Sequence, residues 1–162
     1  MNKAEETVKL FRERALTCAT AESCTGGGIG ALITSVAGSS IVYLGGVISY
    51  ANEVKRDVLG VSQEILNTVG AVSGECAEAM AVGVQKLTSA SYAVSVTGIA
   101  GPGGATAEKP VGLIWFGVAS KDKVYSEKKI FSGDREAVRS QTAEHALGLL
   151  MSAANGSLWE EG

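Results

Sequence analysis

The sequence between residues 16 and 33 changes character twice over a short distance, and this change limits the fold more than any other feature. Leu16–Ala21 is short, apolar and rich in Thr and Cys, which is typical of a buried strand. Residues 22–28 read Glu-Ser-Cys-Thr-Gly-Gly-Gly, and residues 29–33 return to a helical pattern. A buried strand that leads through a glycine-rich turn into a helix is typical of α/β proteins, so we expect a sheet with helices packed on it.

The rest of the chain continues this alternation. We expect helices over residues 3–15, 29–33, 52–59, 74–87 and 135–152, a short turn over 63–69, and strands over 16–21, 43–50, 92–96, 111–120 and 123–131. The last two strands are separated by Lys121 and Asp122, which predicts a hairpin, whereas helices separate the earlier strands. This order predicts a three-layer α/β/α fold with a mixed, mainly parallel sheet of five or more strands, in a single domain over residues 1–162.

Composition and charge exclude several classes of function. The net charge is −3 and no basic stripe is present, so nucleic acid is not an expected partner. Apolar runs are broken well short of the ~20 residues that a membrane span needs. The charged N-terminus has no apolar signal region, and the three cysteines form no CxxC pair, so we expect a cytoplasmic protein with reduced thiols. No His, Cys or Asp cluster has metal-ligand spacing, so no metal and no cofactor are expected.

Ser23 is the first candidate for chemistry. It stands at the expected strand-to-helix turn, where backbone N–H groups suit an oxyanion or a phosphate. Gly26 and Gly27 would let a ligand approach the backbone closely. The alternative is that Ser23 or Thr25 only caps the following helix. Cys24 is a competing nucleophile by position, but as the neighbour of Ser23 in an extended segment it would point the other way.

A serine nucleophile needs a base, and the sequence offers two candidates. The one histidine, His145, falls within the last expected helix and has no obvious partner, which disfavours a Ser-His-Asp arrangement. A Ser–Lys arrangement remains, in which a partly desolvated lysine has a pKa low enough to accept the serine proton. Lys55 follows the strand that ends near Ser49, so it can lie at the same sheet edge as Ser23. The alternative is an ordinary solvated lysine.

Two further segments have the composition of binding sites. Residues 98–110 form a long Gly- and Pro-containing loop, which suits a lid or an anion cradle, although it could also be a wide turn before the hairpin. Arg135 and Arg139 lie one turn apart at the start of the last expected helix, and arginine suits phosphate or carboxylate recognition. The alternative for this segment is a capped helix with two solvated arginines.

Seven segments together match a known family in order and spacing. They are ATAESCTGG at 19–27, AGSS at 37–40, SYANEVK at 49–55, GAVS at 70–73, VTGIAGPGG at 96–104, EKPVG at 108–112 and FSGDREAVR at 131–139. This set resembles the C-terminal domain of CinA, the competence/damage-inducible family, and within it the stand-alone nicotinamide-mononucleotide amidases. The resemblance implies a three-layer α/β fold. It also implies metal-independent hydrolysis of nicotinamide mononucleotide (NMN) to nicotinate mononucleotide and ammonia, a step of pyridine nucleotide recycling.

The resemblance also implies roles for individual residues. The catalytic set is Ser23 as nucleophile, Lys55 as base, and Tyr50, which would orient Lys55 or relay a proton. From these positions we infer that the arginines and the glycine-rich loop contact the ribose and phosphate. The full substrate-binding set that we expect is Glu22, Cys24, Thr25, Gly26, Gly27, Asn52, Thr97, Gly98, Ile99, Ala100, Gly101, Arg135 and Arg139.

The expected partner is a small-molecule nucleotide substrate, and we expect a homodimer or a higher homo-oligomer. Two other functions remain open at this point. One is a non-catalytic nucleotide-binding or regulatory module. The other is an interaction domain connected with DNA uptake or repair, to which the acidic charge balance gives little support.

Overall fold

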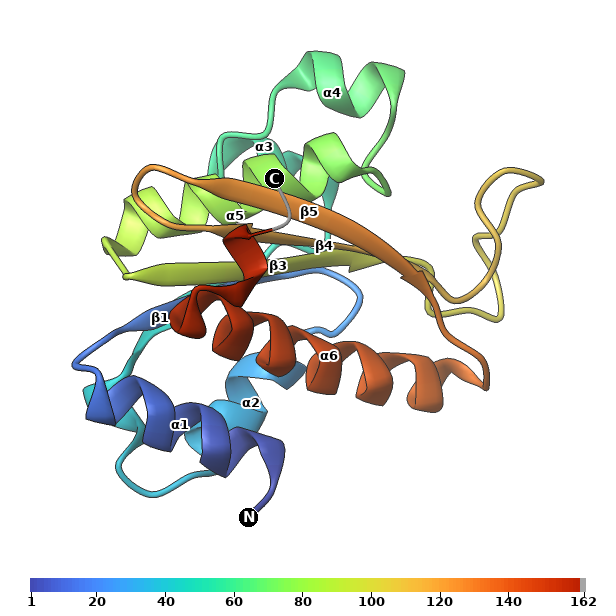
Figure 1. Cartoon of the computed structure of the whole chain (residues 1–162). Helices are drawn as coiled ribbons and strands as arrows, with labels where there is room; N and C mark the ends of the chain where they lie inside the picture. Colours follow the sequence, from blue (N-terminus) through green and yellow to red (C-terminus); the bar gives the residue numbers. More distant parts are fainter. Residues whose placement is uncertain (161–162) are drawn as a thin grey trace.

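A five-stranded sheet forms the centre of the molecule in the computed structural model, which describes residues 1–160 (Figure 1). The strands are β1 (Cys18–Glu22), β2 (Tyr43–Ile48), β3 (Tyr92–Gly98), β4 (Leu113–Ala119) and β5 (Val124–Ile130), in the spatial order β2-β1-β3-β4-β5. β1 pairs in parallel with β2 and β3, while β4 pairs antiparallel with β3 and β5. The predicted mixed sheet is confirmed, and β4 alone runs against the other described strands.

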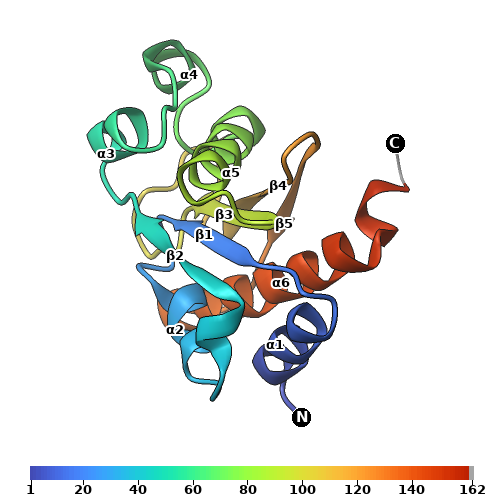
Figure 2. The ribbon, with the colours of Figure 1, turned by 90° about the vertical axis from the view of Figure 1, so that its left-hand side faces the viewer.

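Helices cover both faces of this sheet. They are α1 (Lys3–Glu13), α2 (Gly28–Thr34), α3 (Asn52–Asp57), α4 (Gln63–Thr68), α5 (Gly74–Thr88) and α6 (Arg135–Asn155), with single 3₁₀ turns at Ser39–Ile41 and Ser157–Trp159. Figure 2 shows α1, α2 and α6 on one face and α5, with α3 and α4 beyond it, on the other. The predicted three-layer α/β/α arrangement is therefore confirmed.

Several element ends differ from the sequence prediction by one to three residues, and residues 63–68, expected as a turn, form the helix α4. α1 ends at Glu13 because the chain turns there, and Ala15 adopts a φ of 54°, a conformation that stops a helix. α6 continues to Asn155, three residues past the prediction, and ends where Gly156 takes a φ of 85°. No helix within residues 1–160 has both the length and the apolar character needed to cross a membrane.

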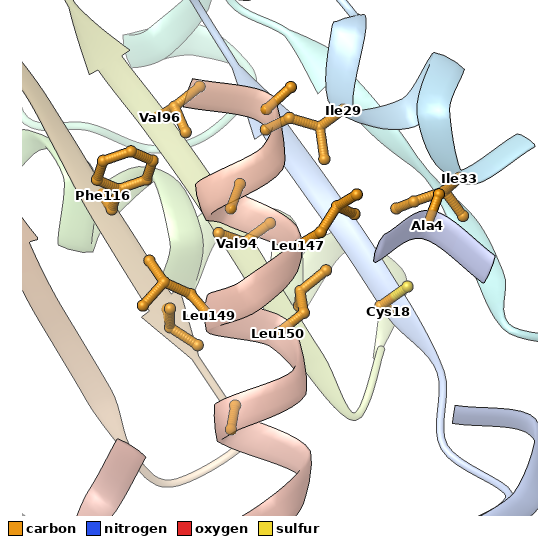
Figure 3. Close-up of a cluster of buried hydrophobic side chains, with 14 of the residues drawn as sticks. Ala4, Cys18, Ile29, Ile33, Val94, Val96, Phe116, Leu147, Leu149 and Leu150 are labelled. Carbon is orange, nitrogen blue, oxygen red and sulfur yellow. The ribbon is translucent and has the colours of Figure 1, made fainter. Parts of the chain in front are cut away.

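The larger core cluster lies between the sheet and the layer that contains α6. Figure 3 shows Leu147 and Leu150 of α6 beside Val94 of β3, with Ile29 of α2 and Cys18 of β1 close by. All five residues of β1 are buried because both faces of the central parallel strands are covered. This double burial explains why the β1 sequence is an unbroken run of small and apolar residues up to its last residue.

The carboxyl ends of three strands meet at one edge of the sheet. Glu22, the last residue of β1, pairs with Ile48 of β2 and with Val96 of β3. The strand that follows β1 in the chain, β2, lies on one side of β1, and the next strand, β3, lies on the other side. The side on which strands are added therefore switches at β1. In open α/β sheets, ligands bind beyond the carboxyl ends of strands at such a point.

Candidate functional site

This arrangement of the strands brings Ser23 and Lys55 together. Ser23 comes directly after β1, and Lys55 lies on α3, which begins shortly after β2. The Lys55 Nζ atom donates a hydrogen bond to Ser23 Oγ at 3.0 Å, and it also donates to the carbonyl oxygens of Ser49 at 2.6 Å and Tyr50 at 3.3 Å. The Lys55 side chain is only 1% exposed. The two predicted residues are therefore in direct contact, and Lys55 is not a solvated surface lysine.

Burial is the feature of the Lys55 surroundings that favours the neutral amine over the charged one. Burial lowers the pKa of Lys55 below its ordinary value of 10.5, and none of the ion pairs within residues 1–160 includes this lysine. A neutral amine has two N–H groups and one lone pair. The protonated amine donates to Ser23 Oγ as well as to the two carbonyl oxygens. Once the amine is neutral, the carbonyl oxygens of Ser49 and Tyr50 can take its two N–H groups, and its lone pair can accept the hydroxyl proton of Ser23. This is the arrangement that a general base needs.

Cys24 has the opposite character. Its side chain belongs to the apolar core cluster, and burial raises its pKa to about 11. Because the thiolate is the reactive form of cysteine, a thiol with this pKa is a poor nucleophile near neutral pH. Ser23 is therefore the better nucleophile of the two neighbours.

The amide groups at the start of α2 are occupied. Glu22 is 2% exposed, and its carboxylate accepts hydrogen bonds from the backbone N–H of Ile29 at 2.9 Å and of Gly30 at 2.9 Å. The expectation that the first turn of this helix receives an oxyanion or phosphate is therefore wrong for these two amides, because a carboxylate of the protein already fills the position. The Glu22 side chain is buried against α2 and does not line the cavity described next.

A cavity of about 260 Å³ opens beside Ser23 and Lys55. Most of the residues predicted for the site line it, namely Ser23, Cys24, Tyr50, Asn52, Lys55, Thr97, Gly98, Ile99, Ala100, Gly101 and Arg135. The cavity lining does not include Glu22, Thr25, Gly26, Gly27 or Arg139. It does include four residues that the site prediction omitted, Ala71, Val72, Gly103 and Gly104, although their GAVS and GPGG segments were part of the family resemblance.

The two arginines occupy different positions. Arg135 donates to the carbonyl oxygen of Gly101 at 2.9 Å and to the Tyr50 hydroxyl at 3.3 Å. Arg139 instead holds the turn after β1, because it donates to the carbonyl oxygens of Cys24 and Thr25, both at 3.0 Å. Both arginines line a second cavity of about 830 Å³, which shares the Ala100, Gly101 and Arg135 wall with the first.

The position of Tyr50 limits what this residue can contribute. Its side chain is 64% exposed, and its hydroxyl bonds to Arg135 rather than to Lys55. Its backbone carbonyl is the group that contacts the Lys55 amine. Tyr50 therefore orients Lys55 through its main chain, and within residues 1–160 no hydrogen bond connects its phenol with Lys55 for a proton relay.

The expectation that His145 has no partner is wrong. Its Nε2 atom lies 2.6 Å from Glu127 Oε2, and its ring packs edge-on against Phe116. This contact joins α6 to β5, and His145 does not line the cavity beside Ser23. Within the part of the chain that the structure describes, no group of three His, Cys, Asp or Glu side chains is arranged to hold a metal ion.

Comparison with known proteins adds to this geometry. The family model of the CinA C-terminal domain matches residues 1–154. The chain is 50% identical over 145 residues to the CinA-like protein of Thermosynechococcus vestitus, which covers 88% of this chain and 35% of that relative. It therefore spans about a third of the length of such curated relatives.

Solved structures match over nearly their whole length. The competence/damage inducible protein CihA from Agrobacterium tumefaciens has a TM-score of 0.90 and 42% identity, with 96% of this chain and 97% of that chain covered. A CinA superfamily protein from Klebsiella pneumoniae has a TM-score of 0.89 and 33% identity, with 96% and 99% covered.

Proposed function

Because the chain belongs to the CinA C-terminal domain family, we propose that it is an amidohydrolase that converts NMN to nicotinate mononucleotide and ammonia. The observation that supports a hydrolytic role most directly is the buried Lys55 amine at 3.0 Å from the Ser23 hydroxyl, without a carboxylate partner. A serine activated by a neutral amine suits acyl transfer, and an amide is an acyl donor. The choice of NMN as substrate follows from the family resemblance of the motifs.

The reaction proceeds in two halves. Lys55 accepts the proton of Ser23 as the serine oxygen bonds to the carboxamide carbon of NMN. The tetrahedral intermediate then collapses, the C–N bond breaks, and Lys55 returns its proton to the leaving nitrogen, so that ammonia departs. Water next attacks the nicotinoyl ester with Lys55 as base. Nicotinate mononucleotide leaves, and the proton returns to Ser23.

The negative oxygen of each tetrahedral intermediate needs hydrogen-bond donors. The amides of Ile29 and Gly30 already bond to Glu22. Ala100 and Gly101 line the cavity, and their backbone N–H groups form no hydrogen bond with another group of residues 1–160. We assign the oxyanion to these loop amides, where one donor is worth roughly 3–4 kcal/mol of transition-state stabilisation.

The two adjoining cavities suggest how a mononucleotide would lie. The smaller one, beside Ser23, takes the nicotinamide ring. The ribose and phosphate extend past Gly101 into the larger one, where Arg135 and Arg139 supply positive charge. Asp134 and Glu136 line the larger cavity as well, and the Asp134 carboxylate accepts a hydrogen bond from the backbone N–H of Ala137.

One experiment distinguishes this function from its alternative. Purified protein is incubated with NMN, and ammonia and nicotinate mononucleotide are both quantified. Equal amounts of the two products support the amidase. Binding of NMN in calorimetry without either product would contradict it and would favour a module that senses a nucleotide without turnover, for which the same cavities and arginines would suffice.

A further inference from the structure

Glu22 is the most completely hydrogen-bonded buried charge in the part of the chain described here, and the reaction does not use it. Beyond the two amides of α2, its carboxylate accepts the Thr25 hydroxyl at 2.6 Å and the Thr20 hydroxyl at 3.3 Å. A carboxylate offers about four acceptor positions, so these four donors occupy all of them. Charge-assisted hydrogen bonds of this kind are roughly twice as strong as neutral ones.

The location of this carboxylate connects it to the nucleophile. Glu22 immediately precedes Ser23, and its hydrogen-bond partners Thr25 and Ile29 follow Ser23 in the chain. The turn that contains Ser23 is therefore fastened on both sides to one side chain. From outside, Arg139 holds the carbonyl oxygens of the same turn.

The residues around Glu22 leave space for this network. The Thr20 hydroxyl also bonds to the Tyr43 hydroxyl at 2.7 Å. A Cβ atom at Gly30 would lie 2.7 Å from the Tyr43 hydroxyl and 3.5 Å from Glu22 Oε2. A side chain at position 30 would displace these groups, so the glycine at that position is what allows the carboxylate to reach α2.

We propose that Glu22 is the positioning residue of the nucleophile: by binding Thr25 and the first turn of α2, its carboxylate fixes Ser23 Oγ at hydrogen-bond distance from Lys55 Nζ. This role rests on the proposed Ser–Lys chemistry. It differs from the substrate contact expected from the sequence, because Glu22 does not line the cavity. It also differs from a general stabilising role, because its effect concerns the distance between two reacting groups.

Two substitutions weaken the network without changing its size. Glu22→Gln replaces one acceptor oxygen with an amino group, which then faces donors. Thr25→Val removes the hydroxyl that donates to Glu22 and leaves the Thr25 carbonyl for Arg139. Ser62→Ala is the matched control, because it removes a helix-capping hydrogen bond of α4 at a residue that does not line the cavity.

The test measures Ser23 directly with a small dialkyl fluorophosphonate, followed by intact-protein mass. In that reaction the serine oxygen bonds to phosphorus, the P–F bond breaks, fluoride leaves, and the serine proton passes to Lys55. The rate constant reports how well Ser23 is placed, whereas the final fraction modified reports how much protein is folded. A misplacement of about 1 Å costs on the order of 100-fold in rate.

We expect Glu22→Gln to reach full modification with a rate constant lowered about 10- to 100-fold. Thr25→Val should show a smaller reduction, and Ser62→Ala should match the wild type. Wild-type rate constants in both Glu22→Gln and Thr25→Val would overturn the positioning role, as would a reduced final fraction with an unchanged rate. If Glu22→Gln does not fold, Thr25→Val decides alone.

The same experiment separates this inference from its premise. A folded wild type that the fluorophosphonate does not modify would overturn the Ser–Lys chemistry and the positioning role together. A wild type that is modified but releases no ammonia from NMN would contradict only the proposed substrate. In that case the rate constants of the variants still support or overturn the role of Glu22.

Discussion

Lys55 Nζ and Ser23 Oγ lie 3.0 Å apart although 32 positions separate the two residues in the chain. The parallel pairing of β1 with β2 produces this contact, since it brings the ends of both strands to the same edge of the sheet. The Lys55 side chain extends from α3, and its Nζ atom donates hydrogen bonds to the carbonyl oxygens of Ser49 and Tyr50. The fold thus holds a buried amine against a hydroxyl, and no carboxylate of residues 1–160 forms an ion pair with this amine.

Lys55→Arg places a permanent positive charge at this position and removes the base. Arginine stays protonated at every accessible pH, so it cannot accept the Ser23 proton. We expect kcat for NMN to fall by roughly 100- to 10,000-fold, the usual contribution of a general base. Steady-state ammonia release measures this. Turnover near that of the wild type would reduce Lys55 to an electrostatic role.

The lowered pKa of Lys55 also predicts how stability depends on pH. The folded protein releases the Lys55 proton at a lower pH than the unfolded chain, in which the pKa of Lys55 is near 10.5. Between these two values the unfolded chain binds more protons, so the free energy of unfolding rises with pH there. Urea denaturation of the wild type and of Lys55→Met at increasing pH measures this. The wild type should gain stability relative to the variant, and a difference that does not change with pH would contradict the prediction.

Two helical glycines should respond to alanine in opposite directions. A Cβ atom at Gly83 in α5 would collide with the backbone carbonyl of Leu59, so Gly83→Ala should lower the free energy of unfolding by about 1–3 kcal/mol. At Gly148 in α6 the nearest atom would be the flexible Lys3 Nζ at 3.6 Å. Gly148→Ala should therefore raise stability by up to about 1 kcal/mol through helix propensity. Urea denaturation of both variants checks the pair, and equal signs would contradict the packing of α5.

The sequence predicted those parts of the fold and site that depend on local pattern. The strand, glycine-rich turn and helix over residues 16–33 have distinct periodicities, so β1 and α2 could be recognised without tertiary information. Ser23 and Lys55 could be paired because each follows a strand whose carboxyl end lies at the same edge. The order of the strands within the sheet had no such local signal.

Features that depend on side-chain direction could not be predicted. Glu22 belongs to a segment with many small polar residues, and nothing in that segment shows that its carboxylate turns toward α2 rather than toward a ligand. His145 of α6 contacts Glu127 of β5, and the sequence alone does not show how α6 is aligned against this strand. The hydrogen bond from Arg135 to the Tyr50 hydroxyl likewise joins residues 85 positions apart, so no local pattern could predict it.

The central claim is that Ser23 is the nucleophile of an amidase, and its most direct test is ammonia release from NMN by the wild type, Ser23→Ala and Cys24→Ala. In this account the buried Cys24 thiol, whose pKa burial raises to about 11, is not the nucleophile. The account predicts that Ser23→Ala, shown to be folded by circular dichroism, releases no ammonia above background, while Cys24→Ala retains most of the wild-type rate. Substantial release by Ser23→Ala, or its loss in a folded Cys24→Ala, would contradict the account.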